Sequence, residues 1–516
     1  MSINKSIAKS AGVIGLATFC SRLLGFCRDI VIARLFGVYL YAQAFVIAFR
    51  IPNLFRDLLG EGAANAAFVP VFSEYAVKHS KEEFWELANV MLNLLLVVLM
   101  SLTILGIVFS PLVVRLIAPG FIADPQKLAV TIKLNRIIFP YILLISLAAY
   151  SMAILNSLKH FTVPAFAPCL LNISIITFAL IFGEGVTGLA LGALVGGALQ
   201  LAVQVPILYK KGFRLRLFQQ FRHAQAKVIG KLMLPRLLSS GIYQLNNFVD
   251  SIFGSLAFIV GEGGVAALYF AYRLIQFPLG IFSTALSQAI LPSMSCQSAE
   301  EKYAELKHTL SFGLRATFFV MLPAAAGFMV LSGRIIETLF GGGRFDAYSA
   351  HTTAGVLFFY SIGLFAYGAN KIVQSCFFAL KDTVTPAKIS ALALGLNIGL
   401  SAWLMFPLKL SGIALATSIS GIVSFFILFF LLRKKIAPFD LKPLSFSFFK
   451  ILAASLLMGV VSYLAAENNF YSRGGTIGKF ISLAFLLLAS GASYIIFCFL
   501  LRVKEVKELQ KWILRR

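Results

Sequence analysis

The sequence predicts an all-α polytopic membrane protein of about 14 transmembrane helices. We expect two six-helix lobes related by a parallel internal repeat, plus two extra C-terminal helices. The prediction rests on composition, on apolar runs of spanning length and on the repeat. Of the 516 residues, 59% are hydrophobic and only 13% are charged, and the mean hydropathy is +0.88. Because so apolar a chain cannot cover its cores with a polar surface, this composition excludes a soluble enzyme, a disordered chain and a disulfide scaffold.

The apolar runs are each long enough to cross a bilayer, which takes about 20 residues in a helix. The first run follows Lys5 and Lys9 and so imitates a signal peptide, but it lacks a small-residue cleavage site and continues through Arg34. We interpret it as a retained first helix. The predicted spans are 8–34, 40–60, 88–117, 130–157, 163–182, 187–209, 232–259, 264–292, 310–331, 351–379, 385–406, 411–432, 447–466 and 477–501.

The net charge of +24 is concentrated in alternate connections between the spans. The loop that begins at Lys210 and Lys211, the end of the twelfth span at Lys434 and the C-terminal tail are all basic, whereas the opposite connections carry few Lys or Arg residues. The positive-inside rule therefore predicts that both termini lie in the cytoplasm. The same distribution explains the positive charge without a nucleic-acid partner.

No motif of a soluble enzyme is present in the sequence. We find no Walker A loop, no HExxH, no strand followed by GxGxxG, and no metal-ligand spacing among the cysteines and histidines. The sequence therefore predicts a protein that is not an enzyme and has no organic cofactor. Any transport would draw on an ion gradient, the membrane potential or the gradient of the substrate itself.

Four sequence matches in register reveal an internal repeat, because the partners in each match are separated by nearly the same length of chain. Ala48-Phe49-Arg50 reappears as Ala271-Tyr272-Arg273, and Leu158-Lys159 followed by Pro164-Ala165 reappears as Leu380-Lys381 followed by Pro386-Ala387. Pro70 pairs with Pro292, and Gly188-Leu189-Ala190-Leu191 pairs with Gly412-Ile413-Ala414-Leu415. We predict an N-lobe at 1–225, a C-lobe at 226–440, and two additional helices with a basic cytoplasmic tail at 441–516. Two parallel repeats imply a cavity between the lobes.

Charged residues lie inside the first two spans, where each one costs about 2.5–3.5 kcal/mol at a helix centre. The spacing Arg22-x5-Arg28-Asp29 recurs as Arg50-x5-Arg56-Asp57. Residues seven apart share a helix face, so Arg22 lies on the face of Asp29, and Ser21 lies with Arg28 on an adjacent face.

Two interpretations of these charges are open, since they could also form structural salt bridges or extend toward the membrane surface. Arginines outnumber acidic partners here, which favours a site for an anion, and guanidinium groups suit phosphate oxygens. We predict a substrate-binding set of Ser21, Arg22, Arg28, Asp29, Arg50, Arg56 and Arg273. Asp250 is a candidate ligand for a sodium ion, although a capping or packing role explains it equally well.

Several of these segments resemble the MurJ/MviN lipid II flippases of the MOP exporter superfamily. The resemblance is carried by Ser21-Arg22-Leu23-Leu24-Gly25-Phe26-Cys27-Arg28-Asp29, Pro52-Asn53-Leu54-Phe55-Arg56, Glu61-Gly62, Ala67-Phe68-Val69-Pro70, Phe139-Pro140-Tyr141-Ile142-Leu143-Leu144 and Pro164-Ala165-Phe166-Ala167-Pro168. It extends along essentially the whole chain.

The resemblance implies a function, a place and a mechanism. It implies that the chain moves lipid II, the undecaprenyl-pyrophosphate-linked peptidoglycan precursor, from the inner to the outer leaflet of the bacterial cytoplasmic membrane by alternating access. The family's cavity arginines match Arg22, Arg28, Arg56 and Arg273, and its following aspartate matches Asp29. The expected partners are lipid II, membrane lipids and the cell-wall synthesis machinery. The last two helices are expected to line a groove for the lipid tail.

The sequence departs from the family pattern at positions where acidic residues are common. Gln43 occupies one such position, and Tyr272 and Gln276 flank the arginine of the eighth span. Fewer acidic neighbours leave Arg273 less neutralised, so a coupling scheme that relies on those carboxylates does not transfer directly.

Two other classes of function are kept as alternatives. The first is a flippase for another polyprenyl-linked glycan, or a cation-coupled exporter of the same superfamily, although such an exporter would pair buried carboxylates with an aromatic pocket. The second is a membrane glycosyltransferase, which needs a catalytic carboxylate near an extracellular loop. The relevant loops offer Asp124, Glu184, Glu262, Asp346 and Glu467, which form no paired constellation.

Overall fold

The computed structural model describes residues 3–55, 68–183, 185–218, 221–436, 442–467 and 475–506. The chain divides into two compact units, Met1–Leu256 and Ala257–Arg516, each of which is described by itself below. Each described part of the fourteen predicted spans contains helix, which confirms the all-α membrane class. The lobe boundaries after residues 225 and 440 were predicted from the sequence repeat, whereas the two units are divided by their internal contacts. The lobe boundaries therefore remain predictions.

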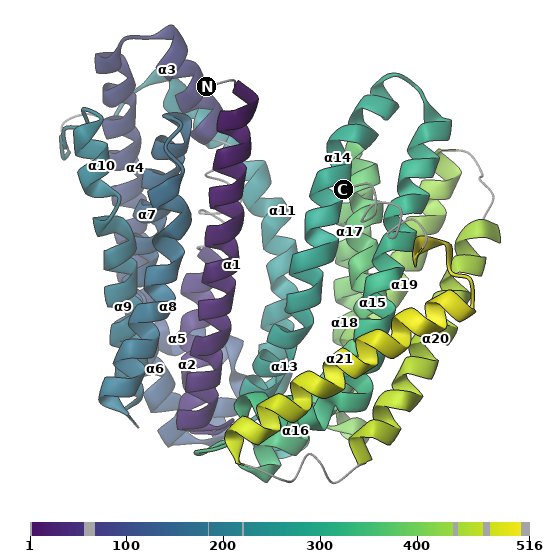
Figure 1. The fold of residues 1–516 in the computed structure, drawn as a ribbon. Coiled ribbons are helices and arrows are strands. Elements are labelled where there is room, and N and C mark those ends of the chain that lie inside the picture. The colour runs from purple at the N-terminus through teal and green to yellow at the C-terminus, as the bar shows by residue number, and fades with distance from the viewer. Residues whose placement is uncertain are drawn as a thin grey trace. The chain divides into compact units, whose positions relative to one another are not determined.

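Unit 1 is a set of helices in which two long pairs, α8 with α9 and α1 with α8, make the most extensive contacts. Figure 1 shows these helices running side by side. The elements are α1 (Ile3–Phe36), α2 (Leu40–Phe55), α3 (Val69–Lys78), α4 (Lys81–Val108), α5 (Ser110–Ile117), η2 (Pro119–Ala123), α6 (Pro125–Ile138), α7 (Tyr141–Ser157), α8 (Thr162–Phe182), α9 (Val186–Ala202), α10 (Val205–Lys210) and α11 (Ala224–Gly254).

Unit 2 repeats this pattern and adds two helices, α20 and α21, that pack on α15 (Figure 1). Its elements are α12 (Ala257–Val260), α13 (Gly264–Pro278), the π-helical turn η3 (Leu279–Ser283), α14 (Thr284–Ala299), α15 (Tyr303–Phe340), α16 (Ala347–Ile362), α17 (Leu364–Ala379), α18 (Val384–Leu408), α19 (Leu410–Lys435), α20 (Lys442–Glu467) and α21 (Thr476–Leu500).

Helix contacts inside the two units correspond in the register predicted from the sequence repeat. The pairs α8–α9, α7–α9 and α2–α6 in unit 1 correspond to α18–α19, α17–α19 and α13–α16 in unit 2. The helix-starting residues correspond as well: Asp124 accepts from the backbone N–H of Lys127 at 3.0 Å, and Asp346, its counterpart in the second repeat, accepts from that of Ser349 at 2.9 Å. A side-chain acceptor at the first turn satisfies a donor that the helix leaves open. These two loop carboxylates are therefore helix caps.

Ten helices of the described chain are long and apolar enough to cross a membrane, and eleven if the bent pair α16–α17 counts as one span. The predicted spans outside that set fall on α1, α2 and α11, which carry the charged and amide side chains. Charged residues lower the hydropathy of α1, and the described part of α2 is only 16 residues long, so length and composition do not settle the predicted count of fourteen.

Each unit has an apolar core where the helices meet. Phe72, Tyr150 and Ile154 lie in the core of unit 1, and Met294 and Leu428 lie in that of unit 2. In both units large apolar side chains also point outward, as expected where lipid replaces water as the solvent. Polar side chains that are buried within a unit consequently stand out as candidates for function.

Candidate functional site

The most deeply buried charges among the predicted site residues are Arg28 and Asp29, in the last third of α1. Arg28 is 3% exposed and Asp29 is 1% exposed. An ion pair removed from water is stabilised only if hydrogen bonds satisfy both partners. The environment of this pair therefore decides whether the helix tolerates it.

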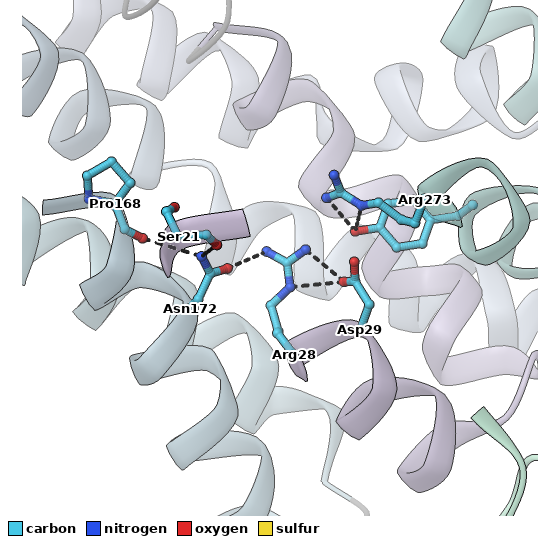
Figure 2. Close-up of polar contacts among 7 residues, drawn as sticks. Ser21, Arg28, Asp29, Pro168, Asn172 and Arg273 are labelled. Atoms are coloured by element: carbon cyan, nitrogen blue, oxygen red, sulfur yellow. Dashed lines mark hydrogen bonds and ion pairs between the residues drawn. The ribbon is translucent and has the colours of Figure 1, made fainter. Parts of the chain in front are cut away.

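A single carboxylate oxygen holds the Arg28 guanidinium from one side. Nε and Nη2 of Arg28 donate to Oδ1 of Asp29 at 3.0 and 2.7 Å. The pairing of neighbouring residues turns the guanidinium back along its own helix (Figure 2). Asp29 is thus a direct electrostatic partner of Arg28, and the two residues act as one group.

The other side of Arg28 is held by a residue that the sequence prediction missed. Asn172 in α8 accepts a hydrogen bond from Nη1 of Arg28 at 3.1 Å, and its Nδ2 donates to the carbonyls of Ser21 and Pro168 at 3.2 and 3.4 Å (Figure 2). Asn172 therefore ties the guanidinium and the α1 backbone to α8. A buried amide in an otherwise apolar membrane helix is the signal that could have identified it.

The predicted faces of α1 are partly tested by these contacts. Ser21 and Arg28, seven residues apart, both meet Asn172, which confirms that they share a face. Ser21 contributes its backbone carbonyl to that contact. Arg22 is exposed, so it does not belong to the buried cluster around Arg28.

The arginines of the second span are only partly described. Arg50 lies in α2, two residues before Pro52, and is half-buried. Arg56 lies outside the described residues, as do Asp57 and Glu61. The predicted roles of Arg50 and Arg56 in substrate binding therefore remain predictions.

In unit 2, Arg273 of α13 is held by an aromatic side chain from the preceding turn. The hydroxyl oxygen of Tyr269 accepts from Nε and Nη2 of Arg273 at 3.2 and 2.9 Å. The guanidinium carbon lies 5.0 Å from the centroid of the same ring, within range of a cation–π interaction (Figure 2). The spacing of four residues places the two side chains on one face, a signal that the sequence prediction did not use.

Two of the neutral residues noted in the sequence, Gln43 and Tyr272, lie against other parts of their own units. Gln43 is 2% exposed in α2, and the ring of Tyr272 packs against that of Tyr360 with centroids 5.7 Å apart. Asp250 lies partly buried in α11 and is the sole acidic residue between Glu184 and Glu262 in the sequence. Within the described ranges, no three His, Cys, Asp or Glu side chains gather into a metal-binding group.

These contacts fit the binding of an anion better than covalent chemistry. A guanidinium offers planar paired donors that match phosphate oxygens, and Arg28 and Arg273 are each fixed in orientation by hydrogen bonds. A side chain held in advance loses less conformational freedom when a ligand binds.

Comparison with known proteins decides the family. The lipid II flippase MurJ family matches residues 32–486 of the chain. The chain belongs to the MurJ family. A probable lipid II flippase MurJ of Buchnera aphidicola subsp. Acyrthosiphon pisum (strain APS) is 35% identical over 487 residues, which cover 93% of this chain and 95% of that one. A lipid II flippase MurJ of Burkholderia cenocepacia is 33% identical, over 87% of this chain and 88% of its own.

Solved structures agree with this MurJ assignment. A lipid II flippase MurJ in an inward closed conformation matches with a TM-score of 0.79 and 29% identity, covering 94% of this chain and 98% of the other. An inward-facing MATE family multidrug transporter of the MOP superfamily matches with a TM-score of 0.67 but only 16% identity, over 81% of this chain and 94% of the other, so this second likeness concerns the fold alone. The family resemblance predicted from the N-terminal motifs is therefore confirmed.

Proposed function

We propose that this chain moves lipid II from the inner to the outer leaflet of the bacterial cytoplasmic membrane, and that Arg28 contacts the diphosphate of this lipid. Membership of the MurJ family supports the substrate. The observation that supports the role of Arg28 is the buried Arg28–Asp29–Asn172 cluster. The proposal includes lipid II and membrane lipids as partners, docking of the cell-wall synthesis machinery, and cytoplasmic placement of both termini.

Transport of this kind needs no covalent step. The guanidinium of Arg28 would replace water around the diphosphate oxygens, while the polyprenyl chain stays in the surrounding lipid. Asp29 offsets the charge of Arg28 when no substrate is bound, so the buried arginine does not face the membrane interior unneutralised. Asn172 keeps the guanidinium at a constant position relative to α8, so the substrate meets a fixed group.

The energy source is a second part of the proposal. The membrane potential would favour return of the positively charged empty protein, and sodium at Asp250 would couple transport to an ion gradient. Asp250 supplies one carboxylate, and the remaining ligands of a sodium ion would be carbonyl and hydroxyl oxygens of the kind that hard cations prefer. Transport that does not change when the membrane potential is dissipated would refute the role of the potential. An Asp250→Asn variant whose transport depends on sodium as the parent's does would refute the sodium site.

The experiment that tests the function measures arrival of lipid II in the outer leaflet of bacteria depleted of their own flippase. We expect rescue by this chain, loss of rescue by Arg28→Ala, and partial rescue by Arg28→Lys, which keeps the charge but not the paired donors. Arg115→Ala is the matched control, because Arg115 is an exposed arginine near the end of α5.

Removal of Arg28 leaves Asp29 buried without its partner, so each variant must be compared at equal levels of folded protein in the membrane. If the parent chain restores no arrival despite correct insertion, another polyprenyl-linked glycan or a cation-coupled exporter becomes the better assignment. If Arg28→Ala rescues as well as the parent chain, lipid II transport stands but the role of Arg28 is refuted.

A further inference from the structure

After α10, residues 212–218 run along the side of α4. We call residues 212–218 the basic strap. It begins at Gly212, whose φ of +107° is a conformation that side chains rarely adopt, and a Cβ there would lie 3.1 Å from Nε1 of Trp85. Phe213 follows, 7% exposed, with its ring 5.6 Å from that of Trp85. The start of the basic strap is therefore anchored in the core of unit 1.

Two asparagines of α4 then clamp the backbone of the basic strap. Asn89 donates to the carbonyl of Arg214 at 3.0 Å and accepts from the N–H of Arg216 at 2.8 Å. Asn93 donates to the carbonyl of Arg216 at 3.0 Å and accepts from the N–H of Phe218 at 3.1 Å. Both asparagines are buried, at 4% and 0% exposure.

The clamp works because two spacings match. Four residues of helix rise about 6 Å, and two residues of extended chain rise about 6.6 Å, so amides one turn apart meet every second residue of the basic strap. Since all four hydrogen bonds go to the backbone, none of them uses a strap side chain. The side chains are consequently left to point away from the clamp.

The outward side chains alternate between basic and apolar. Arg214 and Arg216 are exposed, and Leu215, Leu217 and Phe218 are 46%, 47% and 52% exposed. Arg214 bonds the nearby carbonyls of Tyr209 and Phe213, and Arg216 makes no side-chain hydrogen bond or ion pair within the described part of the chain.

Acidic side chains do not neutralise this surface. The sequence has no Asp or Glu between Glu184 and Asp250, whereas it has eight Lys or Arg residues there. The nearest acidic side chains along the sequence of α4 are Glu82, Glu83 and Glu86, and none forms an ion pair with Arg214 or Arg216 in the described ranges. Because the positive charge of Arg214 and Arg216 is not compensated within the described ranges, we expect an external anion to bind here.

The position of the basic strap along α4 indicates that the strap lies at the membrane surface. The exposed part of α4 becomes apolar one turn beyond Asn93, where Val97 is 45% and Val98 is 61% exposed, and this helix is a candidate span. The Phe218 end of the strap thus lies near the start of the lipid-facing surface, and the Gly212 end lies toward the first turn of α4. Exposed Leu and Phe side chains between arginines are unfavourable in water but suit the boundary between head groups and acyl chains.

We propose that the basic strap is a docking surface for anionic phospholipid head groups, with Arg214 and Arg216 on the phosphates and Leu215, Leu217 and Phe218 in the adjoining acyl region. The clamp by Asn89 and Asn93 holds this surface in place before lipid binds. This surface is separate from the Arg28 cluster and does not depend on which substrate the chain carries.

The test is native mass spectrometry of the full chain in non-ionic detergent, titrated with phosphatidylglycerol or with phosphatidylcholine. We expect the parent chain to bind phosphatidylglycerol more tightly, and the Arg214→Gln/Arg216→Gln variant to bind it about thirtyfold more weakly, since each of the two interfacial arginines contributes about 1 kcal/mol. Lys434→Gln/Lys504→Gln, which removes the same charge at two exposed lysines of unit 2, is the matched control and should keep the affinity.

A second variant separates the geometry from the charge. Asn89→Ala/Asn93→Ala leaves the net charge unchanged but frees the basic strap, so it should also weaken phosphatidylglycerol binding, with the melting temperature measured to confirm folding. Equal binding of the two lipids, or equal losses in the Arg and Lys variants, would overturn the proposal. Competition by inorganic phosphate at the same concentration as the lipid would show instead that the surface binds soluble anions.

Discussion

The helices α4 and α15 occupy equivalent places in the two repeats, and each holds an irregular segment by residues on one face. Asn93 in α4 and Arg315 in α15 stand at the same position in their helices, counted from the helix starts Lys81 and Tyr303. Asn93 clamps the backbone of the basic strap. Arg315 donates to Oε1 of Glu505, beyond the end of α21, at 3.2 Å, and Ser447 of α20 donates to the same oxygen at 2.7 Å.

The difference shows that equivalent faces of α4 and α15 serve two different purposes. A neutral amide bonds to the backbone of any sequence, so the strap side chains stay available for a ligand. A buried arginine requires one particular carboxylate, so the residues after α21 can dock in only one register. The side chains of Arg315 and Glu505 are 14% and 7% exposed, which makes this contact a structural joint that ties the chain after α21 to α15 and α20.

The largest effect is expected from breaking that joint. Glu505→Ala leaves the Arg315 charge buried without its carboxylate and should lower the free energy of unfolding by about 3–5 kcal/mol. Thermal melting in detergent measures the change. The Arg315→Met/Glu505→Leu double variant removes both charges and should lose much less. Asn93→Ala should also lose less, because the exposed strap backbone regains water. A double variant as unstable as Glu505→Ala would show that packing, and not charge, holds the segment.

Two equivalent glycines offer a second comparison. A Cβ on Gly120 in η2 would collide with the backbone carbonyl oxygen of Ser255, whereas a Cβ on Gly342 would meet nothing within 4 Å, although its φ is +111°. We expect Gly120→Ala to cost about 3 kcal/mol through overpacking against backbone, and Gly342→Ala about 1 kcal/mol through strain. Melting temperatures of the two variants check the order. The reverse order would mean that η2 and the end of α11 are not in close contact.

The two buried asparagines of the corresponding helices α8 and α18 provide a third comparison. Asn172 bonds the charged Arg28, whereas Asn397 accepts from the hydroxyls of Ser401 and Thr417 at 3.3 Å. Because hydrogen bonds to charged groups are stronger, Asn172→Ala should cost about 2 kcal/mol and Asn397→Ala about 1 kcal/mol.

Transport separates the two asparagines further. Lipid II arrival, measured at equal protein levels, should fall strongly in Asn172→Ala and little in Asn397→Ala, because only Asn172 positions an arginine proposed to meet substrate. Equal loss of transport in both variants would reduce Asn172 to a packing role.

The smallest effect concerns the turn before α18, where Asp382 occupies the position that His160 has in the first repeat. Lys435 donates to Oδ2 of Asp382 at 2.6 Å, and the N–H of Thr385 donates to Oδ1 at 2.9 Å. These contacts, the Lys435 hydrogen bond first, lower the pKa of Asp382 from 3.8 to about 2. A lowered pKa adds stability that is fully present above about pH 4 and is lost as the pH falls toward 2.

Asp382→Asn should therefore melt slightly below the parent chain at pH 7, and the two should converge near pH 2. The difference should stay below about 1 kcal/mol, because the pair lies at the surface and Asn also caps a helix start. His160→Asn, at the corresponding turn, should leave this acid dependence unchanged. A constant difference between the Asp382→Asn variant and the parent from pH 7 to 2 would assign the effect to capping alone.

Much of this molecule is determined by the order of its residues. The apolar runs predict the helices because a bilayer leaves a spanning backbone no other partner than itself. The constant register of the sequence repeat predicts that helix pairs correspond, and α8–α9 and α18–α19 do so. The spacing of Ser21 and Arg28 predicts a shared face, because both lie on one helix whose geometry repeats about every 3.6 residues.

Only the tertiary structure decided which side chains meet across helices. The pairings of Arg28 with Asn172, of Asn93 with Phe218 and of Arg315 with Glu505 join residues 144, 125 and 190 positions apart. Periodicity places a residue on a face, but it does not state which helix covers that face. Long-range contacts depend on how whole helices pack, so the buried arginine was predictable from sequence and the partner that positions it was not.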